Sequence, residues 1–157
     1  MKSHHNKKLI EMLASENEEA EILKLSMKTL KEHYGLNPGK HARTVRGIGY
    51  QLGLELANDL HSIDIKSLIS ELGEYWKRNE IGEMSWEDEN EGLVAVNFCS
   101  DCISRSYGAG YVLCPFKEGL LEAVLATRLG QKYRVTEVAC CGTQSPGCSF
   151  KLEKLET

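Results

Sequence analysis

The stretch YVLCPFKEGLLEAVL, residues 111–125, decides the fold of this 157-residue chain. Apolar residues dominate it and recur up to Leu129, so the sequence predicts a helix from Leu113 to Leu129. Pro115 is favoured in the first turn of such a helix, and Gly130 is favoured directly after its end. A helix this apolar has to pack on another element, and the segments around it supply one.

Two strands are expected after this helix, Tyr133–Cys140 and Ser149–Leu155, joined by a turn that holds Gly and Pro. Two more are expected before it, Ile81–Trp86 and Leu93–Cys99, with a hairpin turn at residues 88–90. The second half of the chain is therefore expected to form one antiparallel sheet.

The first half of the chain is expected to be helical, because its apolar residues recur at helical spacing. The helices are predicted over Lys7–Tyr34, His41–Leu60 and Ile65–Arg78, and Asp64 is a suitable N-cap for the third. The apolar stripe of the first helix is Ile22, Leu23, Met27, Leu30 and Tyr34. Helices followed by paired strands predict an α+β domain with N-terminal helices packed on one antiparallel sheet.

Three glycines, Gly47, Gly49 and Gly53, fall inside the second expected helix. The spacing differs from a dinucleotide-binding loop, because the third glycine comes one position late and no strand precedes the first. Glycines lower helix propensity, so they indicate a close contact with a neighbouring helix, a dimer contact or room for a ligand.

Length and composition predict one domain over residues 1–157, with a helical arm at 1–36 and a ligand-binding core at 37–157. The net charge of −4 argues against a broad electrostatic contact with nucleic acid. No apolar run is long enough to span a membrane, and the polar start MKSHHNKK gives no signal-peptide core. We therefore expect a cytoplasmic protein, in which cysteines are more often thiols or metal ligands than disulfides.

Four residues near the C-terminus carry metal-binding chemistry: Cys114, Glu137, Cys140 and Cys148. Thiolate sulfurs and a carboxylate oxygen are ligand types that hold zinc tetrahedrally, and four of them would leave no position open for water. Such a closed site is structural. The spacing alone also permits small, buried core cysteines, because it matches no common zinc-ribbon pattern.

Strand geometry sets a condition on this site. Glu137 and Cys140 are three positions apart, so on an ideal strand their side chains point to opposite faces. Both can face one metal only if a bulge or turn near Ala139 changes the alternation.

The segment YVLCPFKEGLLEAVL, the strand TEVAC, the Gly/Pro turn and CSF together resemble the 4-vinyl reductase domain family. The helix ARTVRGIGYQLGLELA also fits, so the resemblance covers roughly residues 40 to 153. This family includes proteins associated with 4-vinyl reduction in bacteriochlorophyll synthesis and sensor domains that bind phenols. It is similar in fold to haem-nitric-oxide-binding and Golgi-transport ligand-binding domains.

The resemblance implies a structural zinc, because phenol-sensing members hold zinc with three cysteines and a glutamate. That pattern falls on Cys114, Glu137, Cys140 and Cys148. The resemblance also implies a cavity for a hydrophobic or aromatic compound between the second and third helices and the sheet, and we expect the chain to form a homodimer. Trp86, Phe98 and Tyr111 are the expected ligand-binding residues. An accessory or enzymatic role in tetrapyrrole 4-vinyl reduction is the alternative.

Cys99 and Cys102 form a C-x-x-C pair outside this pattern, and Cys141 adjoins Cys140. A thiol redox sensor built on these three is a further hypothesis, beside ordinary thiols or a second metal pair. No nicotinamide or flavin motif, no Ser-His-Asp order and no carboxylate pair stands out, so we expect a binding protein rather than an enzyme.

Overall fold

The computed structural model describes residues 18, 20–30, 32–33, 39–88, 93–97, 113–139 and 147–156. Its elements are a 3-10 turn at Gly39–His41, α2 (Ala42–Ala57), α3 (Ile65–Arg78), β1 (Glu83–Asp88), β2 (Leu93–Asn97), α4 (Leu113–Leu129), β3 (Tyr133–Ala139) and β4 (Gly147–Lys154). Residues 20–30 are also helical.

Helices α3 and α4 have the bounds that the sequence predicts, and their end signals are in place. Asp64 caps α3, since its Oδ1 accepts the Ser67 amide at 2.9 Å. Gly130 follows α4 with a φ of 66°, and its amide donates to the Ala126 carbonyl at 3.1 Å. A left-handed backbone conformation of this kind favours glycine, which explains why the helix ends there.

Helix α2 ends at Ala57 rather than at Leu60 as predicted. The amides of Asn58, Asp59 and Leu60 each donate to the carbonyl three residues earlier, so the last turn is tightened. The chain then crosses to Asp64 and begins α3.

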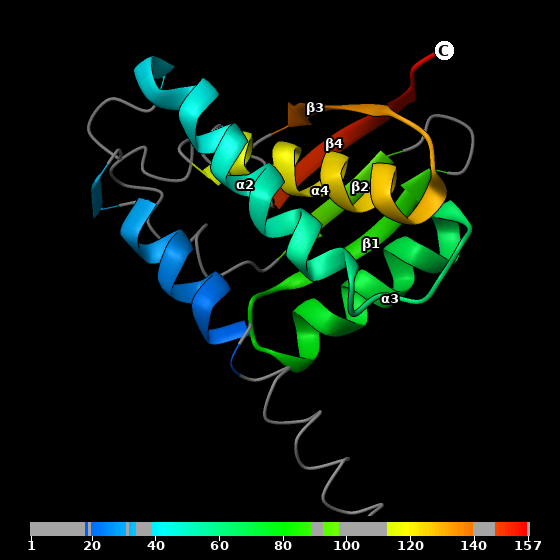
Figure 1. The fold of residues 1–157 in the computed structure, drawn as a ribbon, viewed down its shortest axis with the longest axis horizontal. Helices are drawn as coiled ribbons and strands as arrows, with labels where there is room; N and C mark the ends of the chain where they lie inside the picture. Colours follow the sequence, from blue (N-terminus) through cyan, green and yellow to red (C-terminus); the bar gives the residue numbers. More distant parts are fainter. Residues whose placement is uncertain are drawn as a thin grey trace, which may run out of the picture.

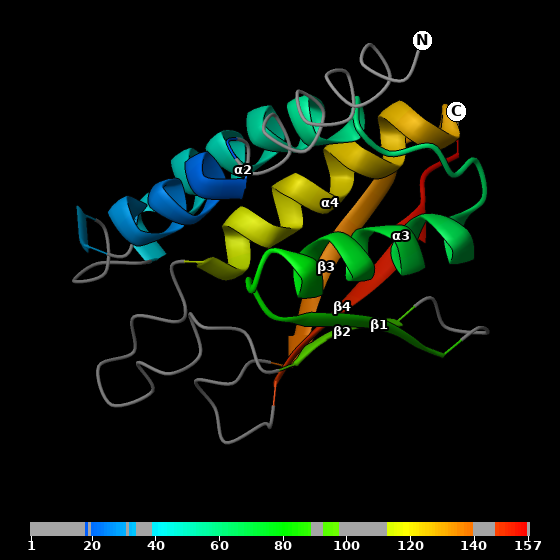
Figure 2. The ribbon, with the colours of Figure 1, turned by 90° about the horizontal axis from the view of Figure 1, so that it is seen from below.

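In the described part of the chain, four strands form one antiparallel sheet in the order β1-β2-β4-β3, which confirms the predicted α+β class. Helices α3 and α4 lie on one face of this sheet, α3 over β1 and α4 over β3 (Figures 1 and 2). Helix α2 packs along α4 in a further layer, and residues 20–30 lie beside α2 (Figure 2). In this strand order, β1 and β3 are the edge strands of the described sheet.

The core lies between the sheet and the helices. Leu68, Ile69, Leu72 and Trp76 of α3 are fully buried, as predicted. Phe116 and Leu121 of α4 and Phe150 of β4 are also fully buried. In the first helix, Leu23, Met27 and Leu30 are buried, but Ile22 is 51 % exposed, so its assignment to the buried stripe was wrong.

Glycine brings α2 and α4 into backbone contact. A Cβ at Gly49 would overlap the Phe116 carbonyl, and one at Gly53 would lie 2.5 Å from the Leu120 carbonyl oxygen. A Cβ at Gly119 of α4 would in turn overlap the Arg46 carbonyl. Gly49 and Gly53 thus serve helix packing within the chain, so the dimer alternative for them was wrong. Gly47 has open space around it.

Candidate functional site

Two of the predicted metal ligands, Glu137 and Cys148, lie on the helix-covered face of the sheet. Glu137 of β3 pairs with Phe150 of β4, and cross-strand partners share a face. Cys148 is two residues from Phe150, so it points the same way, and it is 1 % exposed. The sheet therefore directs a half-buried carboxylate and a buried thiol into the same layer.

The bulge that the metal hypothesis requires is present in β3. Glu137 pairs with Phe150 and Ala139 pairs with Ser149, which leaves Val138 as an extra residue. Val138 is 54 % exposed. A one-residue bulge reverses the alternation of side chains beyond it, which is the change that Glu137 and Cys140 need to share a face.

Helix α4 brings its first turn toward this end of β3. The carboxylate of Glu118 accepts the Glu137 amide at 2.9 Å, and Glu122 accepts the Val135 amide at 2.9 Å. From Glu122 to Glu118 the helix runs four residues, and from Val135 to Glu137 the strand runs two residues. Both segments span about 6 Å, so α4 and β3 stay in register along their length. Cys114 is one turn before Glu118 on the same face of the helix.

The complete ligand set cannot be assembled from the described residues. Cys140 lies outside them, and the side chain of Cys114 is outside them as well. Within the described parts of the chain, no three His, Cys, Asp or Glu side chains are grouped for metal binding. The zinc site remains a prediction.

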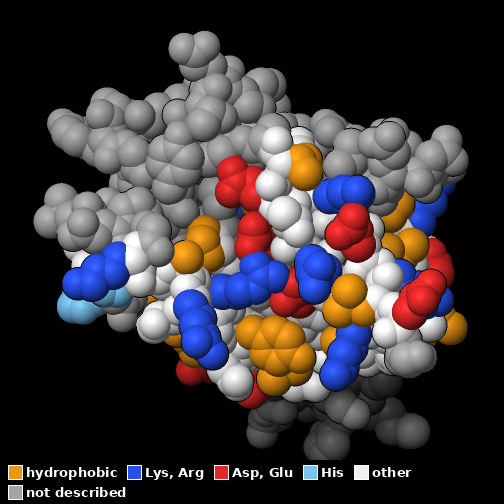
Figure 3. All heavy atoms as spheres, turned by 90° about the horizontal axis from the view of Figure 1, so that it is seen from above, with side chains coloured by type: hydrophobic (Ala, Val, Ile, Leu, Met, Phe, Trp, Pro, Cys, Tyr) orange, Lys and Arg blue, Asp and Glu red, His pale blue; other side chains and the backbone are white. Residues whose placement is uncertain are grey.

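A charged cluster covers the outer edge of β3. Arg46 of α2 forms ion pairs with Glu118 and Glu122 of α4, and its guanidinium also donates to the Val135 carbonyl at 3.2 Å. The carboxylates of Glu122 and Glu118 also accept hydrogen bonds from the amides of Val135 and Glu137. Three backbone groups of β3, the Val135 carbonyl and these two amides, are therefore hydrogen-bonded to side chains. The molecular face that β3 borders shows basic and acidic side chains interspersed (Figure 3).

Glu118 and Glu122 form a structural, ion-paired group that was not singled out from the sequence. They are four positions apart, which places them on one face of the helix. That spacing was the available signal. Arg46 lies more than seventy residues away in sequence, so the third member could not be found from local spacing.

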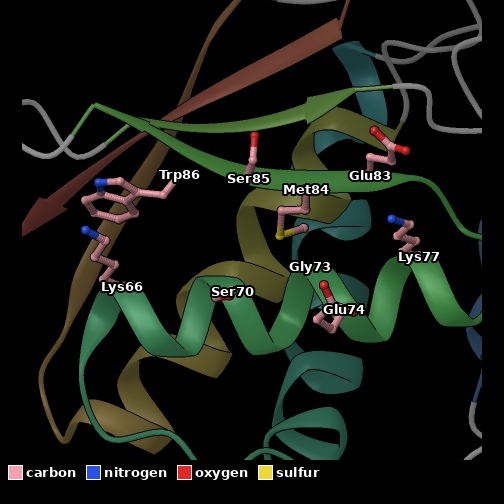
Figure 4. Close-up of a pocket in the computed structure, with 9 residues that line it drawn as sticks. All are labelled: Lys66, Ser70, Gly73, Glu74, Lys77, Glu83, Met84, Ser85 and Trp86. Carbon is pink, nitrogen blue, oxygen red and sulfur yellow. The ribbon is translucent and has the colours of Figure 1, made fainter.

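Trp86 is the one predicted ligand-binding residue whose side chain the structure describes. It is half-buried on β1 and lines a groove of about 370 Å³ between α3 and β1 (Figure 4). Phe98 and Tyr111 lie outside the described residues, as do Cys99, Cys102 and Cys141, the predicted redox thiols.

Two indole nitrogens are buried without a hydrogen-bond partner among the described residues, Nε1 of Trp76 and Nε1 of Trp86. Trp76 is on α3 and Trp86 is on β1, and these elements pack together. A buried N–H donor without an acceptor costs about 1–3 kcal/mol. An acceptor supplied by a ligand would remove that cost.

A smaller apolar pocket of about 210 Å³ lies where residues 20–30 meet α2 and α3. Its lining is Ile22, Leu23, Leu52, Glu55, Leu56 and Tyr75. An engineered apolar cavity of about 150 Å³ holds a benzene molecule, so this pocket has room for one ring or one large side chain.

The position of α3 is fixed by Glu71, which closes the connection from α2. Its carboxylate accepts the amides of His61 and Ser62 at 2.9 and 2.8 Å. Burial raises the pKa of Glu71, but the hydrogen bonds from Ser62 and His61 outweigh it, and the pKa lies below its usual value. From α4, Arg128 donates to the His61 carbonyl at 2.9 Å.

Comparison with known proteins identifies the fold. No family model matches the chain. A protein of Methanocaldococcus jannaschii, Uncharacterized protein MJ0150, is 29% identical over 116 residues, which cover 71% of this chain and 66% of that protein. The chain thus spans just under two thirds of this relative's length.

Two solved structures share the fold. One is a vinyl-4-reductase family protein from Methanocaldococcus jannaschii (TM-score 0.51, 18% identity, 71% of this chain and 68% of that one). The other is the phenol-responsive sensory domain of the transcription activator PoxR with phenol (TM-score 0.54, 13% identity, 83% of this chain and 73% of that one). The chain therefore has the vinyl-4-reductase fold, as its sequence resemblance predicted. In the described parts of the chain, every helix is too short or too polar to cross a membrane.

Proposed function

We propose that this chain is a zinc-braced sensor or carrier domain that binds a hydrophobic or aromatic small molecule bearing a hydrogen-bond acceptor. The observation that carries the proposal is the pair of buried indole donors, Trp76 and Trp86, without acceptors among the described residues. The fold supports it, because a structure with the same fold is described with phenol. A phenolic oxygen would accept from an indole N–H while the ring replaces buried solvent.

The zinc would be held by Cys114, Glu137, Cys140 and Cys148. Three features favour this set: the bulge at Val138, the hydrogen bond that the Glu137 backbone amide donates to the Glu118 carboxylate, and the pairing of Ala139 with Ser149. Cys140 follows Ala139 in the chain and Cys148 precedes Ser149, so a zinc bound by both cysteines would cross-link the paired ends of β3 and β4. A bound zinc would cross-link α4, β3 and β4. With four protein ligands it would have no open coordination position.

We also propose that the chain forms a homodimer. Ile22 and Leu25 on residues 20–30 are 51 % and 64 % exposed, which places two large apolar side chains on one surface helix. Apolar surface of this kind is what a second copy would bury.

Native mass spectrometry of protein purified without added metal tests the metal and the dimer together. We expect a dimer with one zinc per chain, and a Cys148→Ser variant with less zinc and a lower Tm. A metal-free wild-type protein, or a variant that is unchanged in both zinc content and Tm, would refute the brace.

Tryptophan fluorescence tests the ligand class, because the chain has only two tryptophans. Phenol and toluene differ by the hydroxyl group that would accept the indole N–H. We expect phenol to bind about tenfold more tightly than toluene, since one hydrogen bond contributes about 1–1.5 kcal/mol. Trp76→Phe or Trp86→Phe should reduce this preference; equal affinities for both compounds would contradict the proposal.

A further inference from the structure

The pocket where residues 20–30 meet α2 and α3 has one charged side chain in its lining. Its other lining residues are apolar or aromatic: Ile22, Leu23, Leu52, Leu56 and Tyr75. Leu23, Leu56 and Tyr75 are each at most 5 % exposed, so they form the floor of the pocket. The charged residue is Glu55, which is exposed. An occupant therefore meets apolar surface inside and a carboxylate at the mouth.

The Glu55 carboxylate is free to bind a ligand. Within the described part of the chain it forms no hydrogen bond or ion pair. The lysines of residues 20–30, Lys24 and Lys28, each pair with a glutamate three or four positions away, at 3.3 and 4.0 Å. On α2 itself no basic residue follows Arg46. Glu55 thus keeps its negative charge at the mouth of the pocket without a cation from either of these helices among the described residues.

The size of the pocket limits the apolar part of a ligand. Its volume of about 210 Å³ holds one ring, since an apolar cavity of about 150 Å³ holds benzene. Pockets of this kind bind through apolar contact, and their few polar groups fix the orientation of the ligand. Here the only charged group is Glu55, so the ligand is expected to carry its polar group at one end.

The chemistry of Glu55 selects the charge of that end. An ionised carboxylate only accepts hydrogen bonds, and a protonated primary amine offers three N–H donors together with the opposite charge. An ammonium group within about 6 Å of the Tyr75 ring would also be attracted to the face of that ring. A carboxylic acid, by contrast, would bring a second negative charge to Glu55.

We propose that this pocket is a second binding site, for a small primary amine carried on a single apolar ring. The ring lies between residues 20–30, α2 and α3, and the ammonium group pairs with Glu55. The site is separate from the groove beside Trp86, and of its lining only Ile22 belongs to the surface proposed for the dimer. This inference depends on neither the zinc site nor phenol binding.

The test is a titration of the labelled full chain with benzylamine and with benzyl alcohol, followed through amide chemical shifts. The two compounds share the same ring and differ in charge, because an alkyl amine is protonated at pH 7. We expect shifts at Leu23, Leu52 and Glu55. Benzylamine should bind about fivefold more tightly than benzyl alcohol, the gain expected for one exposed charge pair.

A variant at Glu55 isolates the charge. Glu55→Gln keeps the size of the side chain and should reduce benzylamine binding to the level of benzyl alcohol, whose own affinity stays the same. Its Tm should be that of the wild type, since the carboxylate has no bond to lose among the described residues. Glu83→Gln, the same change at an exposed position of β1 outside the pocket, should leave both affinities unchanged.

A second variant tests the pocket itself. Leu52→Phe places a ring in the pocket from a half-buried position and should abolish the binding of both compounds. Equal affinities for the two compounds, or shifts that miss the pocket, would overturn the proposal. So would equal effects of Glu55→Gln and Glu83→Gln, or undiminished binding to Leu52→Phe. In each of these cases phenol binding, measured separately, would still test the proposed function.

Discussion

At the β3 edge of the sheet, Arg46, Glu118 and Glu122 bond to the backbone of the strand, whereas at the β1 edge helix α3 lies directly against the strand backbone. Exposed sheet edges promote aggregation, so the side chains on β3 and the helix on β1 both protect the sheet from pairing with another molecule. They differ in what remains accessible: ion pairs occupy the β3 edge, and a groove flanks the β1 edge.

The difference indicates a division of roles. The closed β3 edge borders Glu137 and the first turn of α4, where the metal ligands are predicted, and it serves the structure. The β1 edge borders Trp86 and the groove between α3 and β1, where we propose that recognition takes place. Substitutions that open the first edge or distort the second therefore give different outcomes.

The largest effect is expected from Gly49→Ala, which would push α2 away from α4 and withdraw Arg46 from the β3 edge. Overpacking against backbone leaves no flexible side chain to move, so we expect a loss of about 3 kcal/mol in urea unfolding. Gly47→Ala on the same helix meets open space and should stabilise by about 0.5–1 kcal/mol. Similar effects of the two substitutions would contradict the described helix contact.

Arg46→Ala opens the β3 edge without altering helix packing. It leaves Glu118 and Glu122 partly buried beside each other without their cation, and we expect a loss of about 2 kcal/mol. Arg43→Ala, in the exposed part of the same helix, is the matched control and should change stability by less than about 0.5 kcal/mol. Equal stabilities for the two variants would show that the cluster does not hold this edge.

Gly73→Ala distorts the β1 edge. The new methyl group would press on the Met84 carbonyl, so α3 has to move away from β1, at about 1–2 kcal/mol in the same unfolding assay. Tryptophan emission should change with it, because Trp86 lies on the moved wall. A variant with wild-type stability and emission would mean that the walls are not in contact.

The smallest effect is expected from Glu71→Gln, which weakens the bonds that place α3. Because the folded pKa of Glu71 lies below its ordinary value of 4.5, its stabilisation is present above pH 4.5 and is lost as the pH falls through the folded pKa. The variant should lose about 1 kcal/mol at pH 7 and less at pH 3. A constant difference between pH 7 and pH 3 would exclude this role.

Local signals in the sequence predicted the parts of the fold that local chemistry determines. Asp64 and Gly130 mark helix ends through their own hydrogen bonding and backbone conformation, so α3 and α4 were placed correctly. The requirement for a bulge near Ala139 followed from strand alternation alone. The end of α2 was placed three residues late, because the apolar pattern continues through the tightened last turn to buried Leu60.

The features that depend on tertiary contact were not predicted. The cluster of Arg46 with Glu118 and Glu122 joins segments far apart in sequence, and the groove between α3 and β1 forms only once Gly73 meets Met84. Of the predicted sites, the structure describes the side chains of Glu137, Cys148 and Trp86, whose roles as metal ligands and as a ligand-binding residue stay predictions.

The division of roles between the two edges can be tested by recording amide and indole N–H chemical shifts of labelled protein as phenol is added. We predict shifts confined to α3 and β1, with the largest at the indole N–H groups of Trp76 and Trp86, and no change at the Val135 and Glu137 amides. Shifts concentrated at β3 and α4, or none at β1, would contradict the assignment of recognition to the β1 edge.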